Sequence, residues 1–281
     1  MLTLKRAAAL RRELTAAQHI PCSAHVSEHV VRTVCGDYLQ VFRLGGASFE
    51  SADDEQLNTS HERLNVVLRN IASPNVALWT HIVRRRERCS VADEPVTGFA
   101  QALARKYRER LATETLMVNE LYLAVLYRPA ATVATGLAAR LLSRAQPDSS
   151  QLELADALDA CAKLAQTLRA SLARYDPELL GAYRAGNSWC SSLLEFVGVL
   201  VNGEWQRMPL SRGPLNEALA TTRLLFGAEA IEYRTPTGTR VGAILGIKEY
   251  PTPTVVGMFN RLLSAPFPLV LTQSFAFLSK A

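Results

Sequence analysis

The stretch IASPNVALWTHIVRRRER, residues 71–88, decides how this chain is organised. Pro74 follows a helical pattern and closes it, because proline cannot continue a helix. From Asn75 onward, apolar side chains fall on both faces of an extended segment. One face carries Ala77, Trp79, His81 and Val83, and the other carries Val76, Leu78, Thr80 and Ile82. A strand that is apolar on both faces is typical of the interior of a sheet, so residues 75–86 predict an interior strand.

Four arginines end this stretch: Arg84, Arg85, Arg86 and Arg88. We expect them to mark where the strand leaves the sheet. They could form one positive face with the basic residues of the next predicted helix, which are Arg105, Lys106, Arg108 and Arg110. Phosphate binding needs several converging cations, and base stacking needs aromatic side chains, of which only Tyr107 is near. A solvated face is therefore favoured, followed by a contact with a protein partner or an acidic lipid surface, and then by nucleic acid.

Hairpins and helices surround the predicted interior strand. Two strands are expected in 24–46 around a Gly36–Asp37 turn, and a second hairpin in 229–251, turning at TPTG. A helix is expected in 51–73, with Ser51 as its N-cap. Its apolar face, at helical spacing, consists of Leu57, His61, Leu64, Leu68 and Ile71. Further helices are predicted in 98–112, 151–173, 190–202 and 254–264, and further strands in 115–129 and 268–278, the last of them buried.

This mixture of elements predicts an α+β fold with mainly antiparallel sheets built from hairpins, and with packed helices. A strand-strand-helix-strand pattern occurs near both ends of the chain. The expected organisation is a helical lead-in at 1–20, a first α+β half at 21–143, a loop or linker at 144–151, and a second α+β half at 152–281.

The composition is that of an ordinary globular protein, with 48% hydrophobic and 20% charged residues. The net charge of +5 permits contact with nucleic acid or an anionic membrane without demanding it. Five widely spaced cysteines without a CxxC motif favour reduced thiols in a cytosolic protein. The longest uncharged run, Leu262 to Ser279, is interrupted by Pro266 and Pro268. We therefore expect a helix end, a turn and a strand there rather than a membrane span.

Two short motifs look like catalytic signatures but lack the required context. HVSEH, residues 25–29, matches the pattern in which His25, Glu28 and His29 would form a zinc hydrolase site on one helix face. The flanking residues favour a strand, in which positions four apart are separated by about 13 Å and cannot share one metal. GAILGIKEY, residues 242–250, lacks the spacing of a P-loop, and Pro251 stops a helix from opening there. We therefore assign no catalytic, cofactor-binding or metal-binding residue.

Five longer stretches resemble one protein family. They begin with IPCSAHVSEH (20–58), HERLNVVLRN (61–86), ETLMVNELYL (114–129), FVGVLVNGEW (196–210) and AEAIEYRTPT (228–275). Together they resemble the N-terminal part of the conjugal transfer and type IV secretion ATPases of the CagE/TrbE/VirB family. The resemblance extends from about residue 4 to residue 281.

In that family, a domain of this kind precedes a RecA-like ATPase domain, which carries the P-loop and binds ATP and magnesium. The sequence stops before that domain would begin, so no catalytic residue or cofactor of the family is carried onto a position here. The resemblance implies a docking and assembly role at the cytoplasmic face of the bacterial inner membrane, serving pilus biogenesis and the transfer of DNA or protein. Expected partners are inner-membrane type IV secretion components and further copies of the chain. The candidate contact residues are Arg84, Arg85, Arg86 and Arg88.

Overall fold

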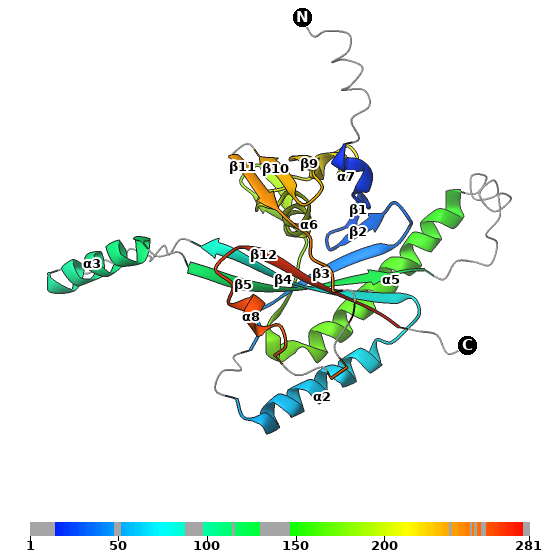
Figure 1. Ribbon diagram of the computed structural model, residues 1–281. Coiled ribbons are helices and arrows are strands. Elements are labelled where there is room, and N and C mark those ends of the chain that lie inside the picture. The colour runs from blue at the N-terminus through cyan, green and yellow to red at the C-terminus, as the bar shows by residue number, and fades with distance from the viewer. Residues whose placement is uncertain are drawn as a thin grey trace, which may run out of the picture.

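The computed structural model describes residues 15–47, 52–87, 98–113, 116–129, 147–235, 238–247, 249, 252–253 and 257–277. Figure 1 shows one large sheet with helices on both of its faces. The predicted α+β fold with mainly antiparallel sheets is confirmed.

The opening stretch forms β4 (Val76–Glu87), an interior strand of the large sheet. The other strands of this sheet are β1 (Cys22–Ser27), β2 (Val30–Thr33), β3 (Tyr38–Leu44), β5 (Leu116–Tyr127), β6 (Pro177–Leu179) and β12 (Leu269–Ala276). The order is β1-β2-β3-β5-β4-β12, and β6 pairs with β3 beside this path. Every pairing in the sheet is antiparallel. Strands from both predicted halves of the chain therefore share one sheet.

Helices cover both faces of this sheet because its interior strands are apolar on both sides. α2 (Asp54–Asn70) and α5 (Pro147–Ser171) cover one face, where Val67 and Leu168 belong to the same buried cluster as Phe42. α6 (Ser192–Asn202) and the short α7 (Leu215–Leu219) cover the other face, where the ring of Phe196 lies 4.4 Å from that of Tyr122. Figure 1 shows these two helix pairs on opposite sides of the strands.

Smaller elements complete the fold. The hairpin of β7 (Ala182–Ala185) and β8 (Ser188–Ser191) leads directly into α6. A three-stranded antiparallel sheet is formed by β9 (Arg223–Phe226), β10 (Ile231–Thr235) and β11 (Gly238–Gly242). The short α8 (Asn260–Leu263) precedes β12, and two 3-10 turns occur at η1 (Ala16–His19) and η2 (Ala173–Tyr175).

Both predicted hairpins are confirmed. β2 and β3 turn around Gly36–Asp37, with Gly36 in the left-handed region at φ +90°, and β10 and β11 turn at the TPTG sequence. The first predicted strand of the earlier hairpin is divided into β1 and β2 by a turn at Glu28 and His29. The predicted helix over 98–112 is α3 (Phe99–Thr113), and the one over 190–202 is α6.

Two predictions for α2 need correction. Its N-cap is Asp53 rather than Ser51, because the Asp53 carboxylate accepts a hydrogen bond from the backbone N–H of Gln56 at 2.8 Å. Ser51 lies outside the described residues. The predicted apolar face is wrong at His61 and Leu64, which are exposed, and it omitted the buried Val67. It is confirmed at its C-terminal end, where Ile71 is buried and Leu68 packs against the same cluster. Only the C-terminal part of α2 therefore packs fully on the sheet.

The C-terminal strand and α5 also differ from expectation. β12 is an edge strand and is not buried, with Val270 and Phe275 each 43% exposed. α5 begins at Pro147, within the segment 144–151 that was expected to be a loop. Among the helices that the structure describes, none combines the length and apolarity needed to cross a membrane.

β4 and β5 continue beyond the other strands as a two-stranded arm. β12 pairs with β4 only as far as Arg84, and β3 pairs with β5 only as far as Leu121. The β4–β5 pairing extends further, to Glu87 and Leu116. α3 follows β4 and precedes β5 in the sequence, and Figure 1 shows it at the end of this arm, apart from the helices that cover the sheet.

Candidate functional site

The predicted arginine cluster is divided by the alternation of side chains along β4. Arg84 is the last residue of β4 that pairs on both sides, whereas Arg85 and Arg86 pair with β5 alone. The arginines thus lie where β4 leaves the broad sheet, but they remain within a paired strand. Because neighbouring residues of a strand point to opposite faces, Arg84 and Arg85 cannot act on one surface. Arg84 and Arg85 therefore do not share the single positive face considered from the sequence, and Arg88 lies outside the described residues.

Arg84 is a structural residue that is only 8% exposed. Its Nε donates a hydrogen bond to the carbonyl of Ala265 at 2.6 Å, and its Nη1 donates one to Oδ1 of Asn119 at 2.9 Å. The Asn119 amide in turn donates to the carbonyl of Leu263 at 3.0 Å. These contacts hold the segment that follows α8 against the β4–β5 pair, so the guanidinium group of Arg84 stabilises the fold and is not available to a partner.

Arg85 points to the opposite face, where α6 lies, and joins a cluster centred on Glu120 of β5. Arg85 donates to Oε1 of Glu120 at 3.0 Å, and Arg43 of β3 donates to the same oxygen at 3.2 Å. The Tyr122 hydroxyl donates to Oε2 of Glu120 at 3.1 Å. The register of β3 against β5 explains why these side chains are close together. Arg43 pairs directly with Tyr122, and Glu120 precedes Tyr122 by two residues and so lies on the same face of β5. We call Arg43, Arg85, Glu120 and Tyr122 the Glu120 cluster.

The charges in this cluster stabilise one another. Burial alone would raise the pKa of Glu120, but the hydrogen bond and charge of Arg85, with Tyr122 and Arg43, lower it overall. The hydrogen bond to Glu120 raises the pKa of Arg85, and burial beside this carboxylate raises the pKa of Tyr122. A carboxylate whose oxygens are already occupied is a poor general base, so the cluster is suited to positioning and binding rather than proton transfer.

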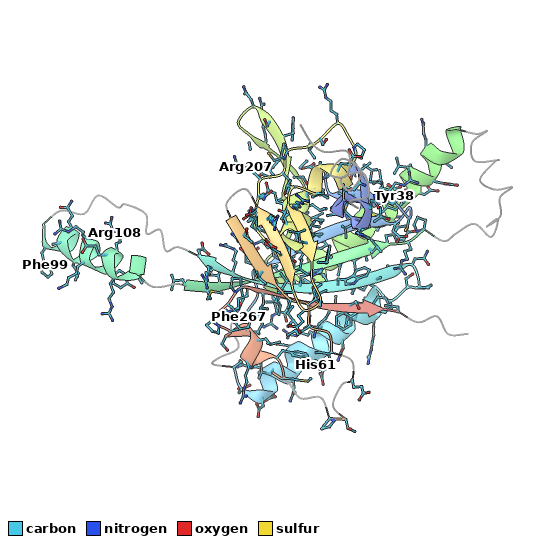
Figure 2. All side chains as sticks on the ribbon, turned by 45° about the horizontal axis from the view of Figure 1, so that its top comes forward. Tyr38, His61, Phe99, Arg108, Arg207 and Phe267 are labelled. Carbon is cyan, nitrogen blue, oxygen red and sulfur yellow. The ribbon has the colours of Figure 1, made fainter. Side chains whose placement is uncertain are left out.

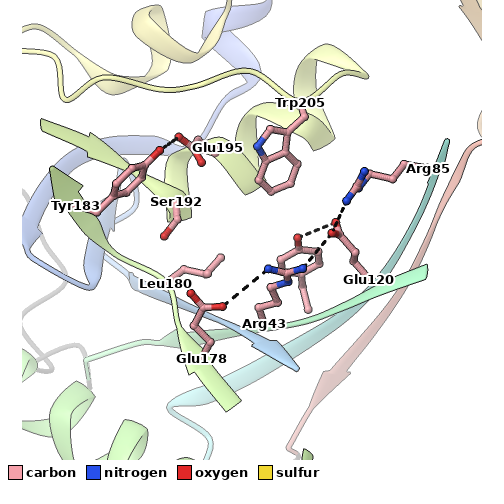
Figure 3. Close-up of a pocket in the computed structure, with 10 residues that line it drawn as sticks. Arg43, Arg85, Glu120, Glu178, Leu180, Tyr183, Ser192, Glu195 and Trp205 are labelled. Atoms are coloured by element: carbon pink, nitrogen blue, oxygen red, sulfur yellow. Dashed lines mark hydrogen bonds and ion pairs between the residues drawn. The ribbon is translucent and has the colours of Figure 1, made fainter. Parts of the chain in front are cut away.

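The Glu120 cluster forms one wall of an open cavity of about 530 Å³, which we call the charged pocket (Figure 3). Its remaining lining residues come from the second half of the chain and are Glu178, Leu180, Tyr183, Ser192, Glu195 and Trp205. Buried Glu195 accepts a hydrogen bond of 2.6 Å from the Tyr183 hydroxyl, which raises the pKa of Tyr183. Trp205 is 45% exposed, and Glu178 reaches Arg43 only at 4.0 Å. The pocket therefore combines a paired ionic wall with an exposed indole and a loosely held carboxylate.

Most of these residues were missed by reasoning from the sequence. Arg85 was singled out, but Arg43, Glu120 and Trp205 were not. One signal was available, since Glu120 is the only charged residue in the otherwise uncharged strand LMVNELYLAVLY, and a charge there requires a partner. The identity of that partner depends on the pairing of β3 with β5, which no local pattern reveals.

Two of the H-x-x-E-H residues lie close together, since Nε2 of His29 is 3.7 Å from Oε1 of Glu28. His25 lies on β1, as the flanking residues predicted, and its Nε2 is 2.9 Å from the Ser191 hydroxyl. His29 lies in the following turn, with its Nδ1 3.1 Å from the carbonyl of Leu180. Within the described part of the chain, no group of three or more His, Cys, Asp or Glu side chains is placed to hold a metal ion.

Comparison with known proteins places two long segments of the chain in related families. Residues 29–134 match the N-terminal domain of the type IV secretion system ATPase VirB4/TrbE, and residues 178–281 match the CagE, TrbE, VirB family, a component of type IV transporter systems. The first range holds the Glu120 cluster, and the second holds Glu178 and Trp205. The charged pocket is thus built from both matched ranges.

Individual relatives agree with these matches. The type IV secretion system protein virB4 of Bartonella henselae is 35% identical over 274 residues, covering 97% of this chain and 35% of the relative. The virB4 protein of Brucella suis is 35% identical over 283 residues, with 98% and 34% covered. PtlC, a type IV secretion system protein of Bordetella pertussis, is 34% identical over 281 residues, again with 98% and 34% covered.

The chain spans about a third of the length of these relatives, and one matched range is the part of the family defined as its N-terminal domain. This chain therefore belongs to the VirB4/TrbE family of type IV secretion ATPases and corresponds to their N-terminal region.

Proposed function

We propose that this chain is the docking and assembly region of a type IV secretion ATPase, and that the charged pocket receives a segment of another secretion component. The observation that carries this proposal is the pocket itself. Its ionic wall lies on paired strands of the central sheet, and the exposed Trp205 lines it as well. Tryptophan and arginine are the residues most often found at the energetic centres of protein interfaces.

The charges of the pocket favour a basic partner segment. Three carboxylates, from Glu120, Glu178 and Glu195, line it against the two guanidinium groups of Arg43 and Arg85. The two guanidinium groups are already paired with Glu120, whereas Glu178 is 64% exposed at its side chain. A lysine or arginine of the partner would be attracted by the Glu178 carboxylate and by the Trp205 indole, which both line the pocket.

The family relationship supports the rest of the proposal. We expect the partners to be inner-membrane components of the same secretion system, together with further copies of this chain. The corresponding location is the cytoplasmic face of the inner membrane. ATP and magnesium belong to the ATPase domain of the family, so we expect this region to act without binding either.

A nucleic-acid role for the arginines is less well supported. Arg84 is buried and Arg85 is paired with Glu120, so two of the four guanidinium groups are unavailable to phosphate. Only Arg86 of the three described members is exposed. Several converging cations are needed for phosphate binding, and β4 does not provide them.

The test is affinity of the purified chain for inner-membrane components of the same secretion system. Trp205→Ala and Glu178→Gln should each weaken the complex, the first by about thirtyfold, as expected for a central interface residue. Glu153→Gln on the exposed side of α5 is the matched control and should bind like the wild type. Unchanged binding by both pocket variants would contradict the docking site. Robust ATP turnover by this chain at micromolar ATP would contradict the proposed role as a whole.

A further inference from the structure

α3 carries a continuous apolar stripe that no part of the sheet covers. Phe99, Leu103 and Tyr107 recur every four residues, so they lie on one side of the helix. Their exposed fractions are 84%, 58% and 60%. Single exposed apolar residues are common, but a stripe of three large ones along one helix marks a surface that contacts something else.

The position of α3 explains why this stripe is exposed. The helix is at the end of the β4–β5 arm, and Figures 1 and 2 both show it apart from the body of the molecule. A helix of 15 residues is of marginal stability in water when it lacks tertiary packing. Contact of its apolar stripe with another surface would supply the missing stabilisation.

The charges of α3 indicate what that surface is. Arg105, Lys106, Arg108 and Arg110 give the helix four cations, and Glu109 is its single carboxylate. Arg105 and Glu109 approach only to 3.9 Å. Each cation near an anionic bilayer is attracted to its headgroups, and a basic helix with an aromatic and aliphatic stripe is suited to lie in the plane of that interface. A second copy of α3 is disfavoured as the occupant because it would bring two strongly positive helices together.

We propose that α3 is an interfacial helix that lies on an anionic lipid bilayer, with Phe99, Leu103 and Tyr107 facing the acyl chains. The β4–β5 arm then sets the distance between the bilayer and the sheet. This inference rests on the proposed function only for the nearness of a membrane. It concerns a different surface from the charged pocket and needs no secretion component.

Lipid vesicles provide the test. The full 281-residue chain should float with vesicles of phosphatidylcholine containing 30% phosphatidylglycerol, with about tenfold weaker binding to pure phosphatidylcholine or in about 0.5 M salt. The double variant Phe99→Ser/Leu103→Ser should reduce binding about tenfold or more, as should Arg105→Glu/Lys106→Glu. Arg63→Glu/Arg69→Glu makes the same charge change at exposed positions of α2 and should bind like the wild type.

The outcomes separate this inference from its rivals. Failure of the wild type to bind the anionic vesicles would overturn it, and so would undiminished binding by the Phe99→Ser/Leu103→Ser variant. If that variant loses a secretion component while no form of the chain binds vesicles, the stripe contacts protein and the lipid inference is wrong. Loss of partner binding by Trp205→Ala with intact vesicle binding would show that the pocket and α3 act separately.

Discussion

Arg84 and Arg85 are adjacent in the sequence, yet they contact opposite sides of the sheet. Arg84 binds Asn119 and the Ala265 carbonyl, whereas Arg85 joins Glu120. Successive side chains of a strand point to opposite faces, and residues 75–86 are predicted to be a strand. The opposite orientations of Arg84 and Arg85 could therefore have been predicted from the sequence. The hydrogen-bond partners of the two arginines could not have been predicted. Asn119 and Glu120 come close to them only through the pairing of β4 with β5, and Ala265 only because the chain returns to β4 after α8.

Arg84→Met should be the most destabilising change within the arginine cluster. It keeps much of the aliphatic volume but leaves Oδ1 of Asn119 and the Ala265 carbonyl without their charged donor. Losing buried hydrogen bonds to a charged group should lower the free energy of unfolding by about 3 kcal/mol. Urea denaturation followed by circular dichroism measures this change.

Arg86→Met is the matched control for this prediction because Arg86 is exposed on the same strand. Its effect should stay within about 0.5 kcal/mol of the wild type. Equal effects of the two substitutions would show that the contacts of Arg84 contribute little to stability.

Helices and strands were predicted well where the periodicity of apolar residues was strong. The N-terminus of a helix and the position of a strand at the edge of the sheet were predicted poorly. β4, β5, α3, α6 and both hairpins follow from their local patterns. β12 was expected to be buried because it is uncharged, yet it is an edge strand. Composition cannot distinguish an edge strand from an interior one when the neighbouring strand is more than 180 residues away. The N-cap of α2 was misplaced by two residues because Ser51 and Asp53 are both favourable capping residues.

The packing of β12 and α6 against β4 should make stability depend on pH through His81. Its ring lies 5.3 Å from that of Phe196 in α6, and its Nδ1 is 2.9 Å from the Thr272 hydroxyl of β12. Burial lowers the pKa of His81 from 6.5 to about 4. Protonation is therefore more favourable in the unfolded chain, and the free energy of unfolding should fall as the pH drops from 6.5 towards 4.

The size of this loss should be about 3 kcal/mol across the window, measured by urea denaturation at successive pH values. His81→Gln should remove most of the slope, leaving the smaller contribution of His25, whose pKa burial also lowers. His61→Gln removes an exposed imidazole and should keep the wild-type slope. An unchanged slope in the His81→Gln protein would show that another group controls the acid sensitivity.

At the scale of the whole molecule, the two predicted α+β halves of the chain contribute strands to one sheet. β6 pairs with β3, and β12 pairs with β4 along eight successive positions. The loop or linker expected at 144–151 suggested a boundary between the halves, but pairing between strands so distant in sequence leaves no local signal. The charged pocket depends on the same long-range strand pairing, since its lining residues come from both halves of the chain.

An engineered disulfide between β4 and β12 tests the pairing of these two strands directly. Thr80 of β4 and Gln273 of β12 are directly opposed, with their side-chain oxygens 3.5 Å apart. Opposed residues of an antiparallel pair have Cα atoms within the range that a disulfide spans. In a Cys35→Ser background, which removes an exposed thiol, Thr80→Cys/Gln273→Cys should form an intramolecular disulfide under mild oxidation, detected by peptide mapping.

Because this bond would close a very long loop, it should raise the free energy of unfolding by up to about 5 kcal/mol, and reduction should abolish the gain. Thr80→Cys/Phe275→Cys is the control, since Phe275 pairs with Leu78 and is displaced by two residues along β12. That pair should cross-link poorly, because diagonal neighbours lie beyond the usual disulfide span. Efficient linkage in the displaced pair but not in the opposed one would mean that β12 pairs with β4 in another register, which would also alter the surroundings of His81.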